Sequence, residues 1–592
     1  MNRQKNKSTF RSTLLALMLV LLLGGAGFLG SPAWAAEICG FSSEAAKNAG
    51  PQYGGTITFL DGFGAAFPPT AWNQGEGSNW TAGIYHEPMY ETLMASDIVV
   101  KGPCGTGESE FYHSNSGPLE VMTGKLAERW ELPDPQTLVW YLRRGILWAG
   151  KPGVMKSREL VAEDIVKSFE LGWQRYPGIG TTKDVESITA KNRYTVVMKS
   201  RQIPKEWEIS FGIAPWLGAT IVPAEVGDEA MKDWKTHVGL GTGPFFLEDY
   251  VEGSYVSYVR NPNYWDSYVF NDKKYEIPFI DRMIKTLIQD KSSQVAALRT
   301  GKIDVYDALE KKFVDSVKRS SPEIKMIERV AERAWRMGMR LDVKPFDDLR
   351  VRRAISMAID REAFINTIQG GRGEILNAEI HIGHSENYYT PLEKMPKEVQ
   401  ENFSYNPERA RQLLAEAGYP NGFETTIQAN AREPERDVVS FLAAMWKDIG
   451  IDVKIDLRDA SVMNGILVKN EHAPMFFGSN SVLAPGSTLN FYAVDEANTY
   501  HVNVVDDPEI NEVYEKYQNT FDPVEAAKII KGLNVLWHKK AYVAYLPTPY
   551  VTVAFWPWVE NYAGEVNDSQ CFSVGGIFGR AWINSDLKAK IQ

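Results

Sequence analysis

Short apolar runs bounded by turn residues predict strands along much of the chain, at 53–60, 137–142, 255–259, 284–288 and 453–457. Between them, apolar residues recur every three or four positions and predict helices at 161–170, 292–298, 347–369, 407–417 and 440–448. The pattern over 347–369 predicts one long amphipathic helix. Because strands and helices alternate, we expect an α/β or mixed α+β fold.

The first 35 residues have the pattern of a secretory signal peptide. Four basic side chains precede an apolar run at 14–23, and Ala33-Trp34-Ala35 is a small-x-small cleavage pattern. An uncleaved membrane anchor is the alternative, because the uncharged stretch 12–36 is long enough to span a bilayer. Glycines and a proline interrupt that stretch, so cleavage is favoured. We expect a processed protein in the periplasm or another extracytoplasmic compartment.

Composition and charge narrow the class of protein. The chain has 592 residues, of which 44% are hydrophobic and 23% charged, as is ordinary for a globular protein. Removing residues 1–35 takes away four basic side chains and lowers the net charge from −11 to −15. An acidic protein of this kind argues against nucleic acid as a partner, which would require a basic face.

Motifs for catalysis or cofactor binding are absent from the sequence. There is no Gly-x-Ser-x-Gly elbow, Walker loop or complete Gly-x-Gly-x-x-Gly, so we expect no cofactor and no enzyme. His381 and His384, with Glu379 nearby, form the only local cluster that resembles a metal site. The alternative is a polar loop, and we predict no metal there.

Aromatic residues are unusually frequent, with 17 Trp, 26 Tyr and 26 Phe. Most are expected in the core. Several stand beside Gly, Asn or Pro, as in Asn79-Trp80 and Trp556-Pro557-Trp558. Rings in such polar loops can serve as platforms for apolar side chains or sugar faces.

A collinear series of short segments resembles the dipeptide/oligopeptide-binding family of ABC-transporter substrate-binding proteins. The series begins with Leu126-Ala-Glu-Arg-Trp130 and Thr137-Leu-Val-Trp-Tyr-Leu-Arg-Arg-Gly145. Its later members, in family order, are Arg260-Asn-Pro-Asn-Tyr-Trp265, Ala296-Ala-Leu-Arg-Thr-Gly-Lys-Ile-Asp304, Pro345-Phe-Asp-Asp-Leu-Arg-Val-Arg-Arg-Ala-Ile355, Tyr405-Asn-Pro-Glu-Arg-Ala410 and Ile449-Gly-Ile-Asp-Val-Lys454. Each segment alone is weak evidence for the family, but the ordered set is specific for it. The set extends from about Gly54 to about Gly564.

The resemblance implies two α/β lobes joined by two crossover strands, with an extra subdomain inserted in lobe one. On this basis we expect residues 36–305 to form lobe one with its subdomain, 306–547 lobe two, and 548–592 the return to lobe one. The crossovers are expected near 304–309 and 545–552. Ligand would lie between the lobes, which close over it by a hinge motion.

Five residues are implied as ligand contacts by the same resemblance. Ser78, Asn79 and Trp80 resemble the first-lobe segment that contacts ligand. Asn480 and Ser481 resemble the second-lobe segment in which peptide-binding members carry an aspartate for the ligand's ammonium group. With Pro485 as the anchor of the alignment, Ser481 takes the aspartate's place. A buried ammonium without a carboxylate is costly, which favours a neutral ligand; Asp495 or another acid could replace the missing group.

The resemblance therefore implies a monomeric receptor that delivers a peptide-like ligand to the membrane permease subunits of an ABC importer. An oligosaccharide receptor of the same family is the alternative within the class. A secreted hydrolase is the alternative from another class, and a chaperone or signalling receptor could share the fold. Both chain ends belong to lobe one in this fold. We therefore expect Cys104 to be unpaired, with a Cys39–Cys571 bridge possible in an oxidising compartment.

Overall fold

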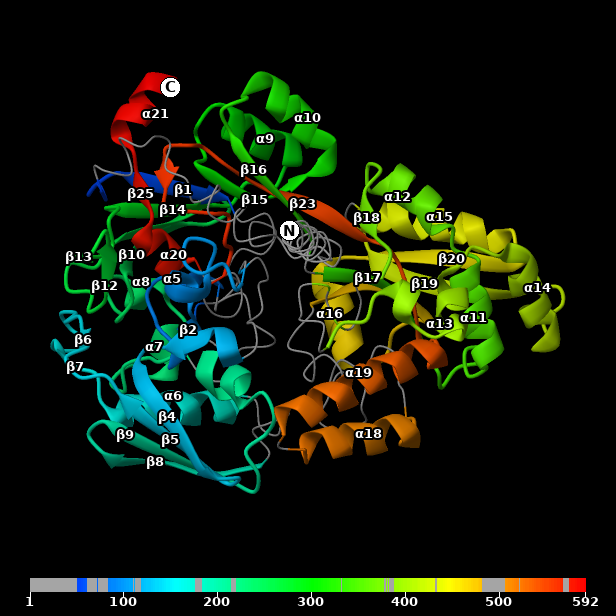
Figure 1. The fold of residues 1–592 in the computed structure, drawn as a ribbon, viewed down its shortest axis with the longest axis horizontal. Helices are drawn as coiled ribbons and strands as arrows, with labels where there is room; N and C mark the ends of the chain where they lie inside the picture. Colours follow the sequence, from blue (N-terminus) through cyan, green and yellow to red (C-terminus); the bar gives the residue numbers. More distant parts are fainter. Residues whose placement is uncertain are drawn as a thin grey trace, which may run out of the picture.

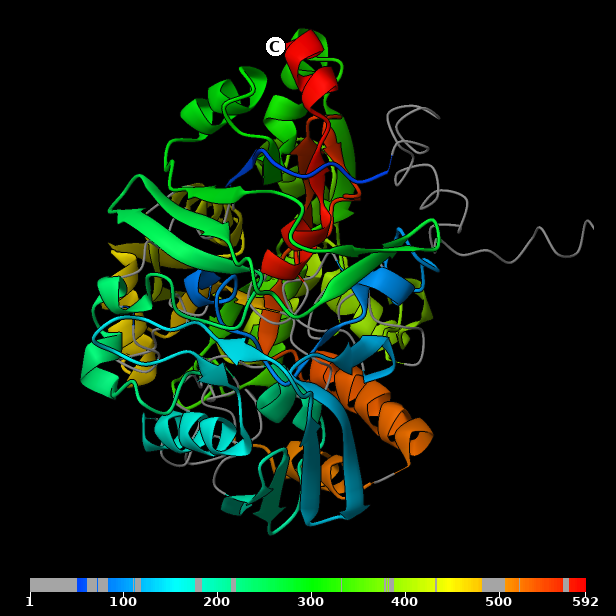
Figure 2. The same cartoon turned by 90° about the vertical axis from the view of Figure 1, so that its left-hand side faces the viewer.

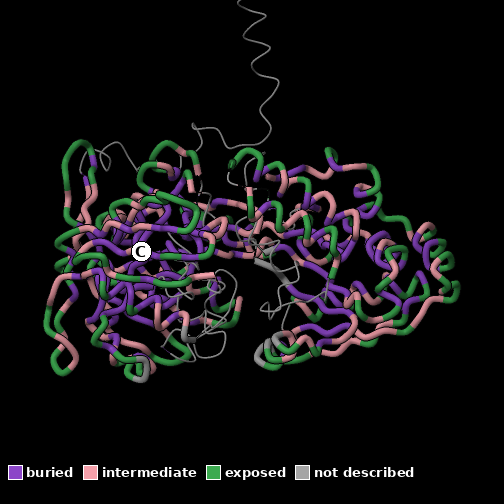
Figure 3. The backbone as a smooth tube through the Cα atoms, turned by 90° about the horizontal axis from the view of Figure 1, so that it is seen from below, coloured by how far each residue is buried: buried purple, intermediate pink, exposed green. Residues whose placement is uncertain are grey.

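The computed structural model has two lobes, each with its own hydrophobic core (Figure 1). The first lobe surrounds a core of buried residues from Ile57 to Ile327 and from Val553 to Ile583, and the cores of the second lobe lie between Ala334 and Leu546. Figure 3 shows buried backbone concentrated inside both bodies. The structure describes residues 50–60, 72, 84–109, 111, 119–175, 184–213, 220–331, 333–376, 380, 382, 388–431, 434–481, 506–520, 522–567 and 574–592.

An eight-stranded mixed sheet forms the centre of the first lobe. β1 (Thr56–Leu60) lies in its middle, parallel to β14 (Arg282–Thr286) and to β15 (Val305–Glu310). Beyond β15, the strand β23 (Thr548–Phe555) pairs antiparallel with both β15 and β16 (Lys325–Val330). The other strands are β10 (Phe245–Val251), β11 (Tyr255–Arg260) and the short β18 (Gly373–Glu374), which a second-lobe loop contributes and which pairs with β23. A late segment of the chain therefore lies inside the sheet.

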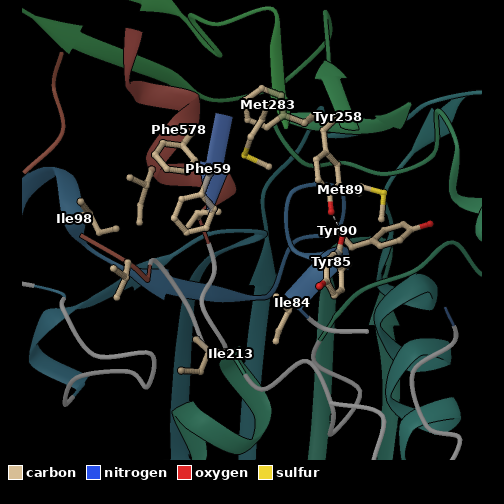
Figure 4. Packing of buried hydrophobic residues seen from close by; sticks show 14 of the residues in the cluster. Phe59, Ile84, Tyr85, Met89, Tyr90, Ile98, Ile213, Tyr258, Met283 and Phe578 are labelled. Atoms are coloured by element: carbon tan, nitrogen blue, oxygen red, sulfur yellow. Dashed lines mark hydrogen bonds between the residues drawn. The ribbon is translucent and has the colours of Figure 1, made fainter. Parts of the chain in front are cut away.

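Aromatic side chains fill the first core around β1 (Figure 4). Phe59 of β1 meets Phe578 of α20 (Gly575–Arg580) edge to face, with ring centroids 5.3 Å apart. Tyr258 of β11 is fully buried, and its hydroxyl donates to the carbonyl of Tyr85 at 2.9 Å. That bond satisfies a polar group which burial would otherwise leave unpaired. One core thus joins the first strand, the segment around Tyr85 and the C-terminal part.

A second sheet forms the inserted subdomain of the first lobe, with strands in the order β4 (Ala127–Asp134), β5 (Thr137–Leu142), β9 (Thr195–Ser200) and β8 (Val185–Asn192). The helix α6 (Ala162–Arg175) packs on this sheet. Asp164 fixes the start of α6, because its buried carboxylate accepts hydrogen bonds from the Arg158 guanidinium at 2.6 and 2.8 Å. The indole N–H of Trp148 donates to the same carboxylate at 3.1 Å.

The second lobe is built on a five-stranded sheet, with strands in the order β20 (Ile451–Arg458), β19 (Phe423–Asn430), β21 (Met475–Ser481), β17 (Arg333–Met339) and β22 (Val543–Tyr545). β19 runs parallel to both of its neighbours, and β17 runs antiparallel to both of its own. The crossover from β19 to β20 is α15 (Glu435–Lys447), in agreement with the helix predicted at 440–448. Both lobes therefore combine helices with mixed sheets, as the alternation predicted.

The single helix predicted over 347–369 is wrong. The chain forms α11 (Leu349–Met357) and α12 (Arg361–Ile368), separated by a short break. The Asp360 side chain accepts a hydrogen bond from the amide of Ala363 and caps α12. At the same break, the buried Arg361 guanidinium donates to the carbonyls of Tyr545 and Phe403 at 3.1 Å. The apolar periodicity continues across the break and therefore concealed it.

The chain changes lobes at two places in the part that the structure describes. β16 belongs to the first-lobe sheet and β17 to the second, so the first passage lies between Val330 and Arg333. The return lies at residues 546–547, between β22 and β23. The sequence-based division ended lobe one at residue 305, at the start of β15. The first core nevertheless includes residues as far as Ile327, because β15 and β16 both pair with β23.

Cys104 forms a disulfide bond, so the prediction that it is unpaired is wrong. The chain has only two other cysteines, Cys39 and Cys571, and both lie outside the described residues. The Cys39–Cys571 bridge considered from the sequence lies outside the described residues. The amide of Val566 donates to the carbonyl of Phe111 at 3.2 Å, which joins the chain shortly before Cys571 to the chain shortly after Cys104.

Candidate functional site

The two passages between the lobes lie side by side and define a hinge. The amide of Ala331, just after β16, donates to the carbonyl of Pro549 in β23 at 2.8 Å. β18, from a second-lobe loop, pairs with the beginning of β23, with Gly373 opposite Pro549 and Glu374 opposite Thr548. Backbone hydrogen bonds therefore connect the first passage and β18 to the beginning of β23, which directly follows the second passage and is the orange strand between the two lobes in Figure 1.

The predicted ligand residues of the second lobe lie next to this hinge. Asn480 and Ser481 are the last residues of β21, and their backbones pair with Ala334 and Arg333 at the beginning of β17. Because β17 follows the first passage directly, this end of β21 faces the junction of the lobes. The structure describes the backbone of these two residues and not their side chains.

The predicted ligand residues of the first lobe, Ser78, Asn79 and Trp80, lie outside the described residues. The described positions that flank them, Trp72 and Ile84, are buried in the first core. Whether this segment meets the end of β21 stays a prediction.

Charged side chains link the lobes on the hinge side. Arg372, in the loop before β18, forms an ion pair with Glu328 of β16, and Lys311 lies 3.4 Å from the same carboxylate. The Arg372 guanidinium also lies 4.2 Å from the ring centroid of Tyr550 in β23. Arg372 is half exposed, so water and salt weaken this contact. The contact therefore positions this loop on β23, and its contribution to the free energy of unfolding is small.

The lobes also touch on the side away from the hinge. The side-chain amide of Gln202, after β9, donates to the carbonyl of Gln518 at 3.2 Å. The hydroxyl of Tyr517 donates to the carboxylate of Glu206 at 3.2 Å. Both second-lobe residues are at the end of α18 (Pro508–Gln518), which lies at the same end of the molecule as the subdomain sheet in Figures 1 and 2. The region between the lobes is thus bounded by contacts on two sides.

Buried histidines of the first lobe are structural. His237 is completely buried, and its Nε2 donates to the carbonyl of Met231 at 2.8 Å, since a carbonyl can only accept. Its Nδ1 therefore accepts from the hydroxyl of Tyr90, 3.1 Å away. Burial lowers the pKa of His237 to about 4, so the ring is neutral at physiological pH. It fills the core beside the rings of Trp72 and His86.

A structural role also explains one motif of the resemblance. Glu91 is buried, and its carboxylate accepts from the hydroxyl of Tyr264 at 3.0 Å and from the indole N–H of Trp265 at 2.9 Å. Burial raises the pKa of Glu91, and the two hydrogen bonds oppose that rise. The aromatic pair that ends the Arg260–Trp265 segment thus attaches a loop to the first core.

No group of three or more metal-binding side chains occurs within the residues that the structure describes. The weak candidate formed by Glu379, His381 and His384 lies outside them. Sequence reasoning did not find the contacts that cross between the lobes. Their partners are between 44 and 316 positions apart, and no local pattern marks either member.

Comparison with known proteins identifies the family. Residues 121–499 match the family model described as bacterial extracellular solute-binding proteins, family 5 Middle. The match covers more than half of the chain, so the protein belongs to this family. The sequence resemblance to peptide-binding receptors had predicted this membership. The family consists of extracytoplasmic substrate-binding receptors and not of enzymes, so the hydrolase alternative has no support from it.

Two relatives illustrate the range of ligands among similar proteins. Heme-binding protein A of Haemophilus influenzae is 27% identical over 423 residues, which cover 67% of this chain and 73% of that protein. The dipeptide-binding protein of Escherichia coli is 24% identical over 365 residues, covering 57% of this chain and 64% of that protein. The chain thus matches about two thirds of the length of these relatives.

Solved structures share the two-lobed fold over nearly their whole length. The periplasmic binding protein DppA of Helicobacter pylori, in complex with the peptide STSA, has a TM-score of 0.70 and 21% identity, covering 90% of this chain and 98% of that chain. AgaA of A. tumefaciens R10, in complex with agropinic acid, has a TM-score of 0.69 and 18% identity, with 90% and 99% covered. These likenesses establish the fold. Within the described residues, no helix is both long and apolar enough to span a bilayer.

Proposed function

We propose that this protein is the extracytoplasmic receptor of an ABC importer and delivers a peptide-like ligand to the membrane permease subunits. The observation that carries the proposal is the architecture of two separately cored lobes connected at a hinge. Closure of such lobes buries most of a ligand, and contacts formed only in the closed state drive it. The protein acts as a monomer, and residues 1–35 direct its export before cleavage.

We further propose that the ligand lies against the end of β21, with Asn480 and Ser481 on one side and Ser78, Asn79 and Trp80 on the other. The position of β21 beside the hinge supports the second-lobe part of this assignment. These side chains are neutral, and a buried ammonium group without a carboxylate is strongly disfavoured. Peptides with a free amino terminus should therefore bind less tightly than neutral or N-blocked ligands.

An oligosaccharide-like ligand is the second candidate. The specific observation in its favour is the structural likeness to AgaA, which was solved with agropinic acid and not with a peptide. Trp80 would offer a ring face and the neutral groups would offer hydrogen bonds, each contributing about 0.5–1.5 kcal/mol. A peptide with a free amino terminus requires a carboxylate at position 481, whereas an oligosaccharide does not. A substitution of Ser481 should therefore change the affinities for the two ligand classes differently.

Mass spectrometry of the solute that co-purifies with the native protein identifies the ligand class. Calorimetry then compares unblocked peptides, N-acetylated peptides and oligosaccharides. We expect Trp80→Ala to weaken binding of the preferred ligand by about tenfold or more, or about 1.4 kcal/mol. Ser481→Asp should improve binding of unblocked peptides, because it supplies the carboxylate that the ammonium requires.

Tyr405→Ala provides the control, because Tyr405 is an exposed aromatic residue of the second lobe. It should bind every ligand as the wild type does. Micromolar binding of unblocked peptides that is insensitive to Trp80→Ala would contradict the site assignment. The absence of any bound solute, both in the native protein and in calorimetry, would contradict the receptor function itself.

A further inference from the structure

A short excursion of the second lobe reaches the first lobe at the hinge. The chain leaves α12 at Ile368, which packs on a second-lobe core, and then pairs with the first-lobe strand β23 through β18. It re-enters a second-lobe core at Leu376. We call residues 369–374 the strap, and Figure 1 shows β18 beside β23 between the lobes. Because the strap has both ends in one lobe and its middle on the other, it is a third connection between them.

The strap is attached where the two passages of the chain meet. Gly373 lies opposite Pro549 in the pairing of β18 with β23. The buried side-chain amide of Gln369 donates to the carbonyl of Pro547, which belongs to the second passage. The amide of Ala331, in the first passage, donates to the carbonyl of Pro549 at 2.8 Å. All three connections therefore converge on residues 547–549.

Other contacts of the strap reach further elements of the first lobe. Arg372 forms an ion pair with Glu328 of β16. Gly370 packs against Lys311, the first residue of α10 (Lys311–Ser320), since a Cβ on this glycine would lie 3.5 Å from the lysine Cγ. The Lys311 ammonium lies 3.4 Å from the Glu328 carboxylate. Each of these contacts is weak in water, but together they fix the strap on one face of the first lobe.

Opening of the lobes affects the two sides of the molecule differently. A rotation about the hinge displaces each atom in proportion to its distance from the axis. The bonds from Gln202 to Gln518 and from Tyr517 to Glu206 lie on the side away from the hinge, so opening separates them. The strap is bound to the same residues as the two passages, so opening moves its contacts little.

Glycines allow the strap to stay in place while α12 moves. Gly370 and Gly371 follow the end of α12, and both are exposed, with φ of 69° and 88°. Glycine passes between such conformations at little cost, which suits a residue that absorbs a hinge rotation. Gly373 has a different role, because a Cβ there would collide with Oε1 of Gln369 and lie 3.0 Å from Cγ1 of Ile365. The fit of β18 on β23 therefore requires a glycine at position 373.

We propose that the strap is a non-covalent third hinge segment, which stays bound to β23 when the lobes open and limits how far they open. The proposal rests on the proposed function, in which the lobes open and close around a ligand. Without the strap, only the two passages of the chain would hold the lobes, and the open form would sample more orientations. The strap therefore lowers the conformational entropy that ligand binding has to remove.

Hydrogen exchange of ligand-free protein tests whether the strap stays attached. Protein freed of bound solute by extensive dialysis is followed by mass spectrometry in peptides that cover 369–376 and 547–555. We expect slow exchange in the wild type, because paired backbone amides exchange only when the pairing opens. In Gly373→Ala, the added methyl group displaces the Gln369 amide from Pro547. Both peptides should then exchange about tenfold faster or more.

Small-angle scattering of the same ligand-free samples tests whether the strap limits opening. We expect a larger radius of gyration for Gly373→Ala than for the wild type. Arg372→Met loses the ion pair with Glu328 and keeps the pairing of β18, so it should give a smaller increase in the same direction. Circular dichroism establishes that each variant is folded. If Gly373→Ala does not fold, the comparison of Arg372→Met with its control decides.

Gly532→Ala and Arg409→Met are the matched controls. Gly532 is an exposed residue of α19 (Pro523–Lys540), and a Cβ there would have no neighbour outside its own helix within 4 Å among the described residues. Arg409 pairs with the exposed carboxylate of Glu416 at 2.8 Å. Both changes repeat the chemistry of the strap variants away from the hinge. They should leave the radius of gyration and the exchange of the strap as in the wild type.

Rapid exchange of the strap in ligand-free wild type, equal to that in Gly373→Ala, would overturn the proposal, because the strap would then detach on opening. An unchanged radius of gyration in Gly373→Ala, or in Arg372→Met relative to Arg409→Met, would overturn it as well. The receptor function is judged separately, by the co-purified solute and by calorimetry. A protein that carries a solute and opens equally far with and without the strap would retain the function and lose the third hinge segment.

Discussion

Buried charged side chains hold distant parts of this chain together. Asp304, the last residue of one segment in the family resemblance, accepts from the amide of Thr58, the indole of Trp558 and the ammonium of Lys588, at 2.7, 2.7 and 2.8 Å. Glu91 and Asp164 serve in the same way elsewhere in the first lobe. Removing one such partner leaves a buried group unsatisfied, which typically costs about 1–3 kcal/mol.

The pH dependence of stability should respond to Glu565. Its carboxyl has a pKa of about 7 when folded, against about 4.5 when unfolded. The stability that the protonated carboxyl contributes is fully present below pH 4.5 and is lost as pH rises to 7, by up to roughly 3 kcal/mol. Glu565→Gln should therefore gain in thermal midpoint relative to the wild type as pH increases from 5 to 8.

Thermal unfolding monitored by circular dichroism across this pH range checks the prediction. Glu424→Gln, at an exposed position of β19, serves as the control and should follow the wild type. A constant difference in midpoint between Glu565→Gln and the wild type would show that the carboxyl is ionised in the folded protein throughout.

Individual site residues could be proposed only through the family resemblance. That resemblance placed Asn480 and Ser481 between the lobes, and the end of β21 does lie beside the hinge. Periodicity alone could not have selected them, because neutral polar residues at a strand end have no distinguishing pattern. The roles of Tyr517 and Glu206 depend on contact across 311 positions of sequence, which a single chain does not reveal.

Helix ends in the second lobe depend on capping side chains. Asp360→Ala should destabilise α12 because the amide of Ala363 loses its acceptor. We expect the free energy of unfolding to fall by about 1 kcal/mol, within the usual range of about 0.5–2 kcal/mol for such caps. Chemical denaturation followed by circular dichroism measures the loss.

Asp459→Ala is the matched control for Asp360→Ala. Asp459 also precedes a helix, α16 (Ala460–Val468), but its side chain forms no capping hydrogen bond. This change should cost much less than the change at Asp360. Equal losses in the two variants would mean that the Asp360 cap does not contribute to stability.

Most elements were predictable because their periodicity and their local signals agree. Asn406 caps α14 (Pro407–Glu416), Pro407 occupies its first turn, and Gly418 just beyond it has a φ of 95°. The helix predicted at 407–417 was therefore nearly correct. At 347–369, the apolar stripe was continuous while Asp360 could serve either as a polar-face residue or as a cap. Only the packing of Arg361 against the chain near Tyr545 decides between them.

At the scale of the whole molecule, the two lobes should unfold separately. Their cores share no buried cluster among the described residues, and few side chains cross between them. Multidomain proteins of this kind do not unfold in a single two-state transition. We expect calorimetry to resolve two components. Arg361→Met, which removes a guanidinium that is buried in the second lobe, should lower the midpoint of one component only.

Arg409→Met provides the comparison, because the Arg409 guanidinium pairs with the exposed carboxylate of Glu416 on the surface of the same lobe. It should leave both components nearly unchanged. A single component that moves as a whole in Arg361→Met would show that the lobes unfold as one unit.

The position of β23 in the first-lobe sheet has a consequence for the order in which a growing chain can fold. β15 and β16 are made early, but each lacks a neighbour until the strand at Thr548–Phe555 is added between them. The second lobe is a continuous stretch and needs nothing that is synthesised later. The usual order, in which the N-terminal part folds first during synthesis, is therefore unavailable here. The half of the molecule that is translated first is the half that must be completed last.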